Sequence, residues 1–224
     1  MIKFENTEVF NFEGALRGMR NPLNSWDKSD STFYCNDNLE VCEKCQYYDV
    51  GCNPQKGVYL GENDLDLAQR LIKAGSDHRK FLRQIFVSVD ITAPLYWWKE
   101  FDTYKVATVA NSCSTMHKIH AKEFTLEDFS IEHLNERGIQ VLEFVIENLE
   151  AYRKMYNIMK DKEDWHNIIQ LLPSSYNQRR TITLTYETLR NIRGSRRNHK
   201  LDEWGIGFME WIDSLPYAEE LIKL

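Results

Sequence analysis

Several features that would assign this 224-residue sequence to a common functional class are missing. No apolar run approaches the roughly 20 residues that a membrane-spanning helix needs, so no membrane segment is expected. The N-terminus, MIKFENTEVFNFEG, has no basic stretch followed by an apolar one, so no signal peptide is expected. Internal repeats and low-complexity linkers are absent as well. These absences favour a cytoplasmic protein with one domain over residues 1–224.

An overall excess of positive charge is also missing. The formal net charge is −6, so the surface as a whole is not that of a nucleic-acid-binding protein, and no nucleic-acid partner is expected. Residues 178–200 nevertheless carry an excess of +6, with Glu187 as the single acid, so the rest of the chain sums to −12. The seven cations are Arg179, Arg180, Arg190, Arg193, Arg196, Arg197 and Lys200. Such a cluster predicts a phosphate-bearing partner, or else a solvated basic helix that pairs with the acidic remainder.

Cysteine is scarce except in one segment. Four of the five cysteines follow the pattern C-x6-C-x2-C-x6-C, at Cys35, Cys42, Cys45 and Cys52. Four thiolates can surround one zinc ion as a tetrahedron, and a central CxxC places two of them on one metal. The spacing is not that of a standard finger, so a surface loop of free or oxidised thiols remains the alternative. We interpret residues 35–52 as a Cys-rich insertion that binds zinc.

The hydrophobic content of 42% is ample for a packed core, and its periodicity predicts the main elements. A helix is expected from Asp64, with Asn63 as its N-cap and Gly75 as its stop. Strict alternation over residues 85–92 predicts a strand with one wet face. Pro94 follows, at a position that the start of a helix tolerates.

Two further helical regions are expected in the second half of the chain. The longest helix is predicted from about Ser130 to Met159, and a third helical region covers residues 199–212. The packed stripe of the long helix consists of Leu142, Val145, Leu149 and Tyr152. A strand followed by helices, without repeats, predicts one mixed α/β (α+β) domain.

A short polar stretch, TVANSCST, occupies residues 108–115 and contains neither lysine nor an acidic residue. By composition it is a tight loop or a polar helix start that satisfies its own backbone. Cys113 and His117 would share a face if the segment were helical, which would allow a Cys–His nucleophile pair. Nothing in the sequence supplies the oxyanion hole that such a pair needs. Trp97 and Trp98 are interpreted as core and subunit-interface residues.

The order of the segments resembles that of the flavin-dependent thymidylate synthases. The chain runs LIKAGSDH, RKFLRQIFVSVDIT, APLYWWKEFD, and then the stretch that ends in TVANSCST. Further on, LLPSSYNQRR and TLRNIRGSRRNHKLDEW resemble two later family elements. The resemblance implies a cytoplasmic homotetramer with one α/β domain per chain. It also implies the use of FAD, NADPH and methylene-tetrahydrofolate to place a methyl group on C5 of the pyrimidine deoxynucleotide dUMP.

The resemblance also assigns site residues. The family motif RHRxxSxxxxSxRY falls on a segment that begins at Thr103 and ends at Met116, and only the cation at Lys105 and the hydroxyl at Thr108 keep their chemical type. The implied nucleotide-binding residues are Arg179, Arg196, Glu100, Thr108, Asn111 and Cys113. The residues implied to contact the flavin are His78, Thr103, Tyr104, Lys105 and Asn191. Arg179 and Arg196 are expected to converge on one anion pocket.

Two functional hypotheses remain open at this stage. In the first, the chain is a flavin-dependent thymidylate-synthase-like enzyme whose sites are built from more than one chain of a homotetramer. In the second, it is a diverged homologue that binds a nucleotide but has lost the flavin, or modifies another pyrimidine nucleotide. Thr103 and Tyr104 separate the two, because neutral side chains do not replace cations on a diphosphate. The apolar run PLYWW at residues 94–98 is the expected subunit contact.

Overall fold

The alternating segment forms the central strand of the molecule. The structure, a computed structural model, describes residues 2–33 and 58–224. Strand β2 (Phe86–Pro94) buries Val87, Val89 and Ile91 on one face and leaves the side chains between them partly exposed. The strand predicted over residues 85–92 is therefore confirmed, with the wet face where the polar residues placed it.

Three further strands complete a four-stranded sheet. They are β1 (Lys3–Phe10), β3 (Val109–Ser112) and β4 (Asn177–Thr185). The strand order is β1-β2-β4-β3, and every neighbouring pair is antiparallel. Strand β4 is therefore central although it lies 83 residues beyond the end of β2 in the sequence. The polar stretch at 108–115 forms edge strand β3 and the turn after it, so its prediction as a loop or a helix start is wrong.

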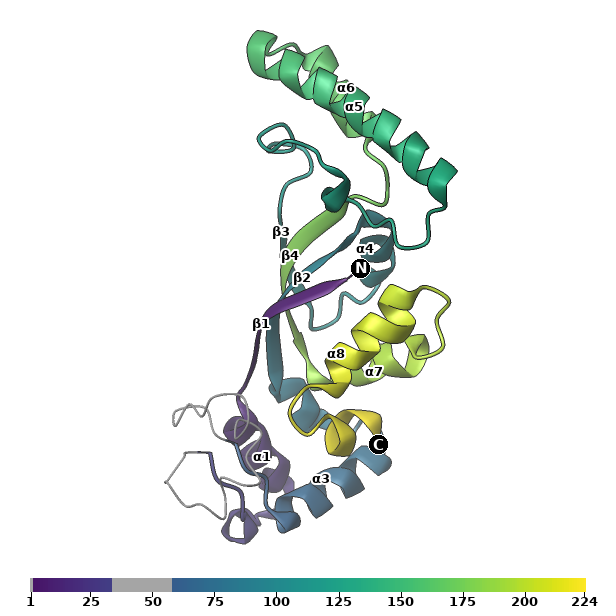
Figure 1. The fold of residues 1–224 in the computed structure, drawn as a ribbon. Helices are drawn as coiled ribbons and strands as arrows, with labels where there is room; N and C mark the ends of the chain where they lie inside the picture. Colours follow the sequence, from purple (N-terminus) through teal and green to yellow (C-terminus); the bar gives the residue numbers. More distant parts are fainter. Residues whose placement is uncertain (1, 34–57) are drawn as a thin grey trace.

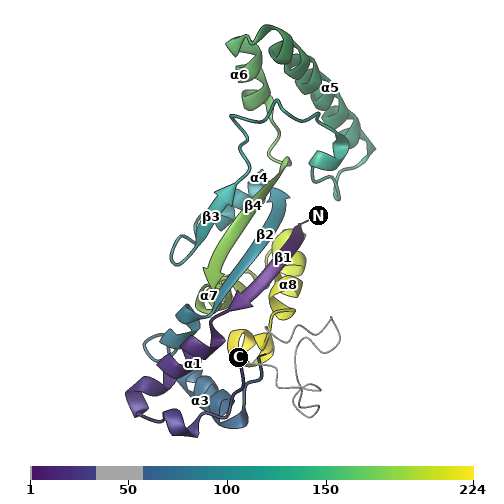
Figure 2. The same ribbon diagram turned by 90° about the vertical axis from the view of Figure 1, so that its left-hand side faces the viewer.

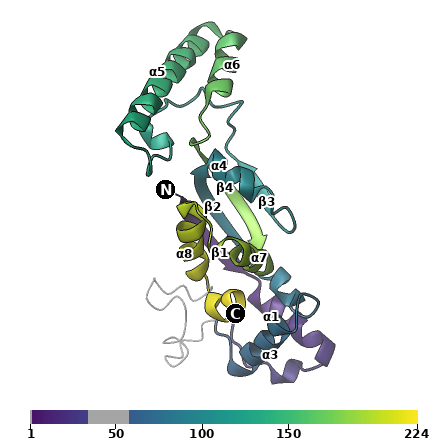
Figure 3. The ribbon, with the colours of Figure 1, turned by 90° about the vertical axis from the view of Figure 1, so that its right-hand side faces the viewer.

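Helices cover one face of the sheet (Figures 1 and 3). They are α4 (Leu95–Phe101), α7 (Tyr186–Arg196) and α8 (Met209–Asp213), joined by a π-helical segment at Glu203–Phe208. Figure 2 shows the opposite face of the sheet with no helix over it in the described chain. The largest fully buried side chains between sheet and helices include Trp97, Trp98, Trp204, Tyr186, Phe101 and Phe208. Trp97 and Trp98 are thus core residues, and PLYWW is not the exposed apolar surface that the subunit-contact prediction assumed.

At the lower end of the sheet, helix α1 (Phe12–Arg20) packs beside helix α3 (Glu62–Lys73) (Figure 1). The start of α3 differs from its prediction, because Gly61 and not Asn63 is the N-cap. The Asp30 carboxylate accepts hydrogen bonds from the backbone N–H groups of Asn63 and Asp64, at 2.9 and 3.1 Å. A distant side chain therefore satisfies the helix start, which a local search for caps does not reveal.

At the upper end, two helices form an arm (Figure 1). They are α5 (Glu136–Met159) and α6 (Lys162–Leu171), and they enclose a second hydrophobic core. Helix α5 begins six residues later than predicted, because the Asn135 side chain accepts a hydrogen bond from Gly138 N at 2.9 Å. The buried members of the arm core are Ile119, Phe124, Phe129, Leu142, Leu149 and Ile168.

The observed architecture is the predicted mixed α/β fold. The remaining helical turns are Asn21–Leu23, Trp26–Lys28, Lys80–Gln84, Leu126–Asp128 and Glu219–Lys223. Among the described residues, none of the helices combines the length and the apolar character that crossing a membrane requires. The predicted Cys-rich insertion at 35–52 lies outside the described residues.

Candidate functional site

Three of the predicted site residues meet where the C-terminal ends of α4 and α7 come together. Arg196 donates from Nη1 to Glu100 Oε2 at 2.7 Å and from Nε to the Tyr104 hydroxyl at 2.8 Å. His199 Nε2 lies 3.3 Å from the same Glu100 oxygen. The Arg196 guanidinium also lies over the Trp204 ring, 5.1 Å from its centroid. We call this group, Glu100, Tyr104, Arg196, His199 and Trp204, the Arg196 cluster.

The Arg196 cluster fixes its arginine in one orientation. Arg196 is about four-fifths buried as a side chain, and two of its N–H donors are held by the carboxylate and the phenol. Stacking on Trp204 and on Tyr104 orients the plane of the guanidinium. A planar guanidinium with donors left over is suited to bidentate binding of a phosphate or carboxylate.

Arg179 lies on the other face of the sheet. Its guanidinium donates to Asp90 Oδ2 at 2.7 Å and lies 3.4 Å from Glu5 Oε2. Its neighbour Arg180 points to the helical face, where it pairs with Asp102 at 2.7 Å. Because side chains alternate along a strand, one chain places Arg179 and Arg196 on opposite faces. A pocket that contains both arginines would therefore need two chains.

The Asp90 carboxylate organises the bare face around Arg179. It accepts hydrogen bonds from Thr181, Asn6 and Arg179, and these bonds hold the pKa of Asp90 well below its usual range. Asn6 adopts a left-handed backbone conformation (φ 52°) at an irregularity in β1, between residues 5 and 8, and so reaches across to β2. The carboxylate is therefore ionised at neutral pH and fixes Arg179 beside it.

A cavity of about 520 Å³ adjoins Arg179 at the end of strand β3. Cys113 lines it, donating from its backbone N to Arg179 O at 2.9 Å, and its own carbonyl accepts from Gln178 Nε2 at 2.7 Å. Burial, followed by the nearby Asp128 carboxylate, raises the pKa of Tyr176, another lining residue. The cavity is lined by Thr92, Cys113, Ser114, Thr115, Lys118, Ile119, Lys122, Glu123, Phe124, Asp128, Tyr176, Asn177, Gln178 and Arg179.

The other residues of the polar stretch are placed by its pairing with β4. Asn111 is exposed and lies opposite Thr181 in the register of the two strands. Thr108 is partly exposed just before β3, and its hydroxyl donates to Val106 O at 3.5 Å. Ser114 Oγ accepts from the backbone N of His117 at 2.8 Å, which closes a turn after the strand. Cys113 and His117 consequently do not share a helical face, and the geometry gives no support to a nucleophile pair.

The segments that carry the predicted cofactor residues come together around α7. Arg79, next to His78, donates from Nε to Glu187 Oε1 at 3.1 Å at the start of α7. Thr188, the residue after Glu187, donates its hydroxyl to Val106 O at 3.4 Å. Val106 directly follows Lys105 in the sequence. His78, Lys105 and Asn191 are themselves exposed.

The fit of these residues to FAD is partial. Thr103 donates its hydroxyl to Glu100 O at 2.7 Å, and Tyr104 belongs to the Arg196 cluster. In the described chain, only Lys105 of these three positions therefore offers a cation to a diphosphate. The exposed His78 and Asn191 add donors around the same helix.

Acids from the rest of the chain pair with most of the basic segment. Besides Arg179 and Arg196, Arg180 pairs with Asp102 and Arg193 pairs with Asp213 at 3.2 Å. Arg190 donates instead to the carbonyl of Ile222 at 2.9 Å. The segregation of charge in the sequence is thus largely an internal pairing between distant segments. The excess of +6 does not by itself require an anionic ligand, because the alternative prediction, pairing with the acidic remainder, accounts for four of its seven cations.

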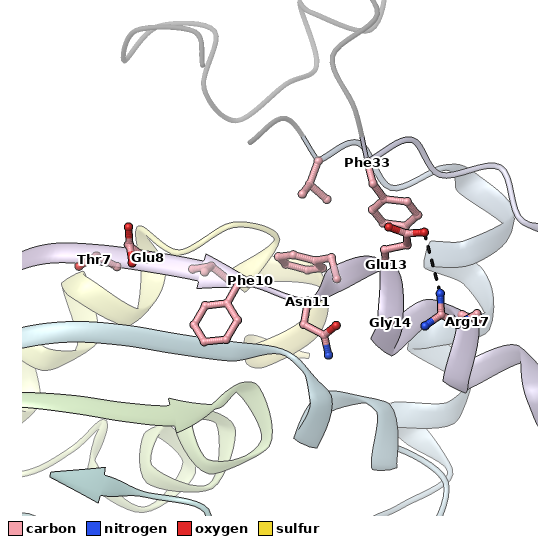
Figure 4. Close-up of a pocket in the computed structure, with 11 residues that line it drawn as sticks. Thr7, Glu8, Phe10, Asn11, Glu13, Gly14, Arg17 and Phe33 are labelled. Atoms are coloured by element: carbon pink, nitrogen blue, oxygen red, sulfur yellow. Dashed lines mark ion pairs between the residues drawn. The ribbon is translucent and has the colours of Figure 1, made fainter. Parts of the chain in front are cut away.

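A second cavity of about 520 Å³ lies at the junction of β1 and α1 (Figure 4). Figure 4 shows Phe10 and Asn11 where β1 meets α1, and the ion pair Glu13–Arg17, at 3.9 Å, on α1. None of the predicted site residues lines it. In the part of the chain that the structure describes, no cluster of three or more His, Cys, Asp or Glu residues could hold a metal. Cys35, Cys42, Cys45 and Cys52 lie outside that part, so zinc binding stays a prediction.

Comparison with known proteins identifies the fold. No protein-family model matches the sequence, and no curated protein matches it. The structure resembles the crystal structure of flavin-dependent thymidylate synthase ThyX from Helicobacter pylori complexed with FAD and dUMP, with a TM-score of 0.65 and 15% identity over 99% of this chain and 97% of that chain. A second Helicobacter pylori ThyX structure, also with FAD and dUMP, gives a TM-score of 0.64 and 15% identity over 100% and 98%. The chain therefore has the thymidylate synthase X fold over its whole length.

Three residues at these sites were not predicted from the sequence. Asp90 could have been identified from the sequence, because it is the single acidic residue on the wet face of the strand predicted over residues 85–92. His199 and Trp204 carry none, because only the return of the chain after α7 brings them against Glu100 and Arg196.

Proposed function

We propose that the chain binds a pyrimidine deoxynucleotide and, with FAD, acts as a flavin-dependent thymidylate-synthase-like enzyme that transfers a one-carbon group to C5 of dUMP. The observation that carries this proposal is the full-length match of the fold to a synthase complexed with FAD and dUMP. The Arg196 cluster supports it, because an oriented guanidinium with N–H donors left over is suited to binding a nucleotide phosphate.

In this proposal the nucleotide site forms between chains of a homotetramer. Arg196 from one chain and Arg179 from another contact the nucleotide, because one chain holds them on opposite faces of its sheet. Glu100 and Tyr104 position Arg196. The cavity beside Arg179, with Cys113 in its wall, lies next to β3, which carries Asn111 and follows Thr108.

The cofactor region is assigned to the surface around α7. His78, Lys105 and Asn191 would hold FAD there, with NADPH and methylene-tetrahydrofolate as co-substrates. When bound, the flavin supplies the hydride chemistry that turns the transferred carbon into a methyl group. The residues of this chain bind and orient the nucleotide and the cofactor.

One observation favours a second candidate, a nucleotide-binding protein without flavin. Thr103 and Tyr104 both use their hydroxyls inside the chain, so Lys105 is left as the single cation of the motif. Such a protein would keep the Arg196 cluster and lose the cofactor.

Three measurements on the purified full chain test the proposal. Visible absorption reports bound oxidised flavin, and calorimetry reports dUMP binding. Release of tritium from C5-labelled dUMP, with FAD, NADPH and methylene-tetrahydrofolate present, reports substitution at C5. All three signals are expected for the enzyme. Binding of dUMP without flavin and without tritium release would identify the second candidate. No dUMP binding would leave only a shared fold.

The cysteines form a separate proposal, in which Cys35, Cys42, Cys45 and Cys52 share one zinc ion. Elemental analysis should then find about one zinc per chain. A content well below that would contradict the zinc site and would leave the nucleotide proposal unaffected.

A further inference from the structure

A third cavity, of about 470 Å³, lies at the lower end of the body, where α1 ends beside α3 (Figure 1). Its wall is formed by residues 20–28 and by the side of α3 that faces them. None of the residues assigned to the nucleotide, to the cofactor or to zinc lines it. We call it the α1–α3 cavity.

Arg20, the last residue of α1, is the buried part of this wall. Its side chain is only 4% exposed. Nε donates to Asp64 Oδ1 at 2.5 Å, and Nη1 donates to the carbonyl and hydroxyl oxygens of Ser25 at 3.2 and 3.3 Å. Within the described chain, Nη2 is buried and has no acceptor. Because a buried charged donor without an acceptor is costly, the cavity lacks a partner that a ligand would supply.

Two further cations line the α1–α3 cavity. Lys28 is exposed and forms no ion pair within the described residues. Arg70 pairs with Asp66 through Nε, at 2.9 Å, which leaves both of its Nη groups available. Asp66 is the single acid of the lining. The N–H donors of three cations therefore surround one cavity, and the buried ion pair with Asp64 uses only one edge of Arg20.

This set of donors fits a phosphate group better than a carboxylate. A phosphate monoester has three acceptor oxygens and a charge of about −1.5 to −2 at neutral pH, whereas a carboxylate has two oxygens and one charge. The cavity also has an apolar part, since Leu67 is buried in its wall and Leu23 is 58% exposed at its edge. Its volume lies in the range of small-molecule sites, so there is room for an organic group beside the phosphate.

The geometry points to a second anion site: we propose that the α1–α3 cavity binds the phosphate group of a small ligand. Nη2 of Arg20 is its innermost donor, and Lys28 and Arg70 close over the phosphate from the solvent side. The inference does not rest on the proposed enzyme activity, because it uses neither the Arg196 cluster nor the surface around α7.

Hydrogen exchange of the full chain, titrated with inorganic phosphate, phenyl phosphate or benzoate, tests the site. Both phosphates should slow amide exchange at residues 20–28, and benzoate should have little effect. Tighter binding of phenyl phosphate would identify an ester as the ligand, and equal binding would identify free phosphate. The readout is local, so a failure here is distinguishable from a failure at the Arg196 cluster. Unchanged exchange at residues 20–28 in millimolar phosphate, or equal protection by benzoate, would overturn the proposal.

Charge variants in the cavity should act in opposite directions. Lys28→Gln should raise the dissociation constant for phenyl phosphate about fivefold to tenfold. Asp66→Asn should lower it about threefold, because it removes the single acid of the lining. Lys73→Gln makes the same charge change as Lys28→Gln on α3 but outside the cavity, and should change the constant less than twofold. Equal effects of the two lysine variants would mean a diffuse attraction and would overturn the site.

Arg20→Lys tests the innermost donor. It keeps the charge beside Asp64 but removes the planar group that carries Nη2, so phosphate binding should fall by more than in Lys28→Gln. Unchanged binding by a folded Arg20→Lys variant would contradict the role of Arg20. Lys28→Gln and Asp66→Asn are exposed changes, and they keep the test decisive if Arg20→Lys does not fold.

Discussion

The body and the arm of this molecule differ in how completely they bury their apolar side chains. In the body, formed by the sheet with α1, α3, α4, α7 and α8, three tryptophans are completely enclosed. In the arm, formed by α5 and α6, the core holds six buried residues, while the described chain leaves a second apolar face of α5 in solvent. Within the described chain, the helical side of the body is therefore closed, and one apolar face of the arm is not. The difference identifies one face of α5, and not PLYWW, as the exposed apolar surface of the described chain.

The same contrast holds for polar groups. The body contains a buried ion pair, in which Arg20 Nε donates to Asp64 Oδ1 at 2.5 Å, with both side chains almost fully enclosed. The arm uses a slightly less buried pair at Glu150–Arg153, whose carboxylate also accepts from Phe124 N at 2.7 Å. Disrupting the body pair should thus cost more than disrupting the arm pair.

The largest effect is expected for Asp64→Ala in the body. Removing this carboxylate leaves Arg20 charged and buried, and loss of one partner of such a pair costs about 3–5 kcal/mol of unfolding free energy. Chemical denaturation measures it. The control is Asp66→Ala, since the Asp66–Arg70 pair is exposed and worth about 0.5 kcal/mol or less. Similar losses for both variants would contradict the distinction.

This difference should depend on pH. Burial acts to raise the pKa of Asp64, but hydrogen bonds from Ser31, Ser29 and Arg20 outweigh it, and the pKa is lowered. The stabilisation is therefore present above the unfolded-state pKa of about 3.9 and is lost as the pH falls through the lower, folded-state pKa. The gap between the wild type and Asp64→Ala should narrow in that acidic range.

The second effect separates the arm from the body. Leu149 is fully buried in the arm core, so Leu149→Ala should cost about 2–5 kcal/mol through lost contacts and a cavity. Hydrogen exchange should show lost protection in α5 and α6 and unchanged protection in β2 and β4. Val141→Ala, on the exposed face of α5, is the matched control and should leave the arm core intact. Loss of protection in the sheet as well would mean that body and arm unfold as one unit.

The third effect concerns binding in the body. Arg196→Ala should weaken dUMP binding by roughly tenfold to a hundredfold, because charge-assisted hydrogen bonds contribute about 1.5–3 kcal/mol each. Arg197→Ala, its exposed neighbour, should weaken it much less. Calorimetry compares the two. Equal losses would indicate a diffuse basic surface in place of a site.

The smallest effect is expected at His120, whose ring centroid lies 4.7 Å from that of Tyr156 in the arm. Burial, followed by the charges of Lys160 and Lys118, lowers the pKa of His120. Below about pH 6.5 the unfolded state binds this proton more readily, so the arm should lose stability as the pH falls from 7.5 to 5.5. Hydrogen exchange in α5 measures the loss, which should be under about 1 kcal/mol for one partly exposed group. In His120→Gln this pH dependence should be absent.

Local periodicity in the sequence determined strand β2, the covered face of α5 and the fold class. It does so because alternation and helical spacing report which side of an element is buried, whatever lies on that side. The family resemblance selected Glu100, Tyr104 and Arg196, which the structure brings together. The sequence could not show that Asp30 caps α3, because a cap from a distant segment leaves no local pattern.

Tertiary structure alone decided the rest. Pairing with β4 turned residues 109–112 into an edge strand, since backbone hydrogen bonds from a partner strand can hold a short polar segment that has no pattern of its own. The same central strand, through the alternation of its side chains, separated Arg179 from Arg196, so one chain does not bring both arginines into one pocket. The exposed face of α5 became visible only when α6 was seen to cover the other. Each outcome depends on which distant segments become neighbours, and that is a property of the topology and not of any local run of residues.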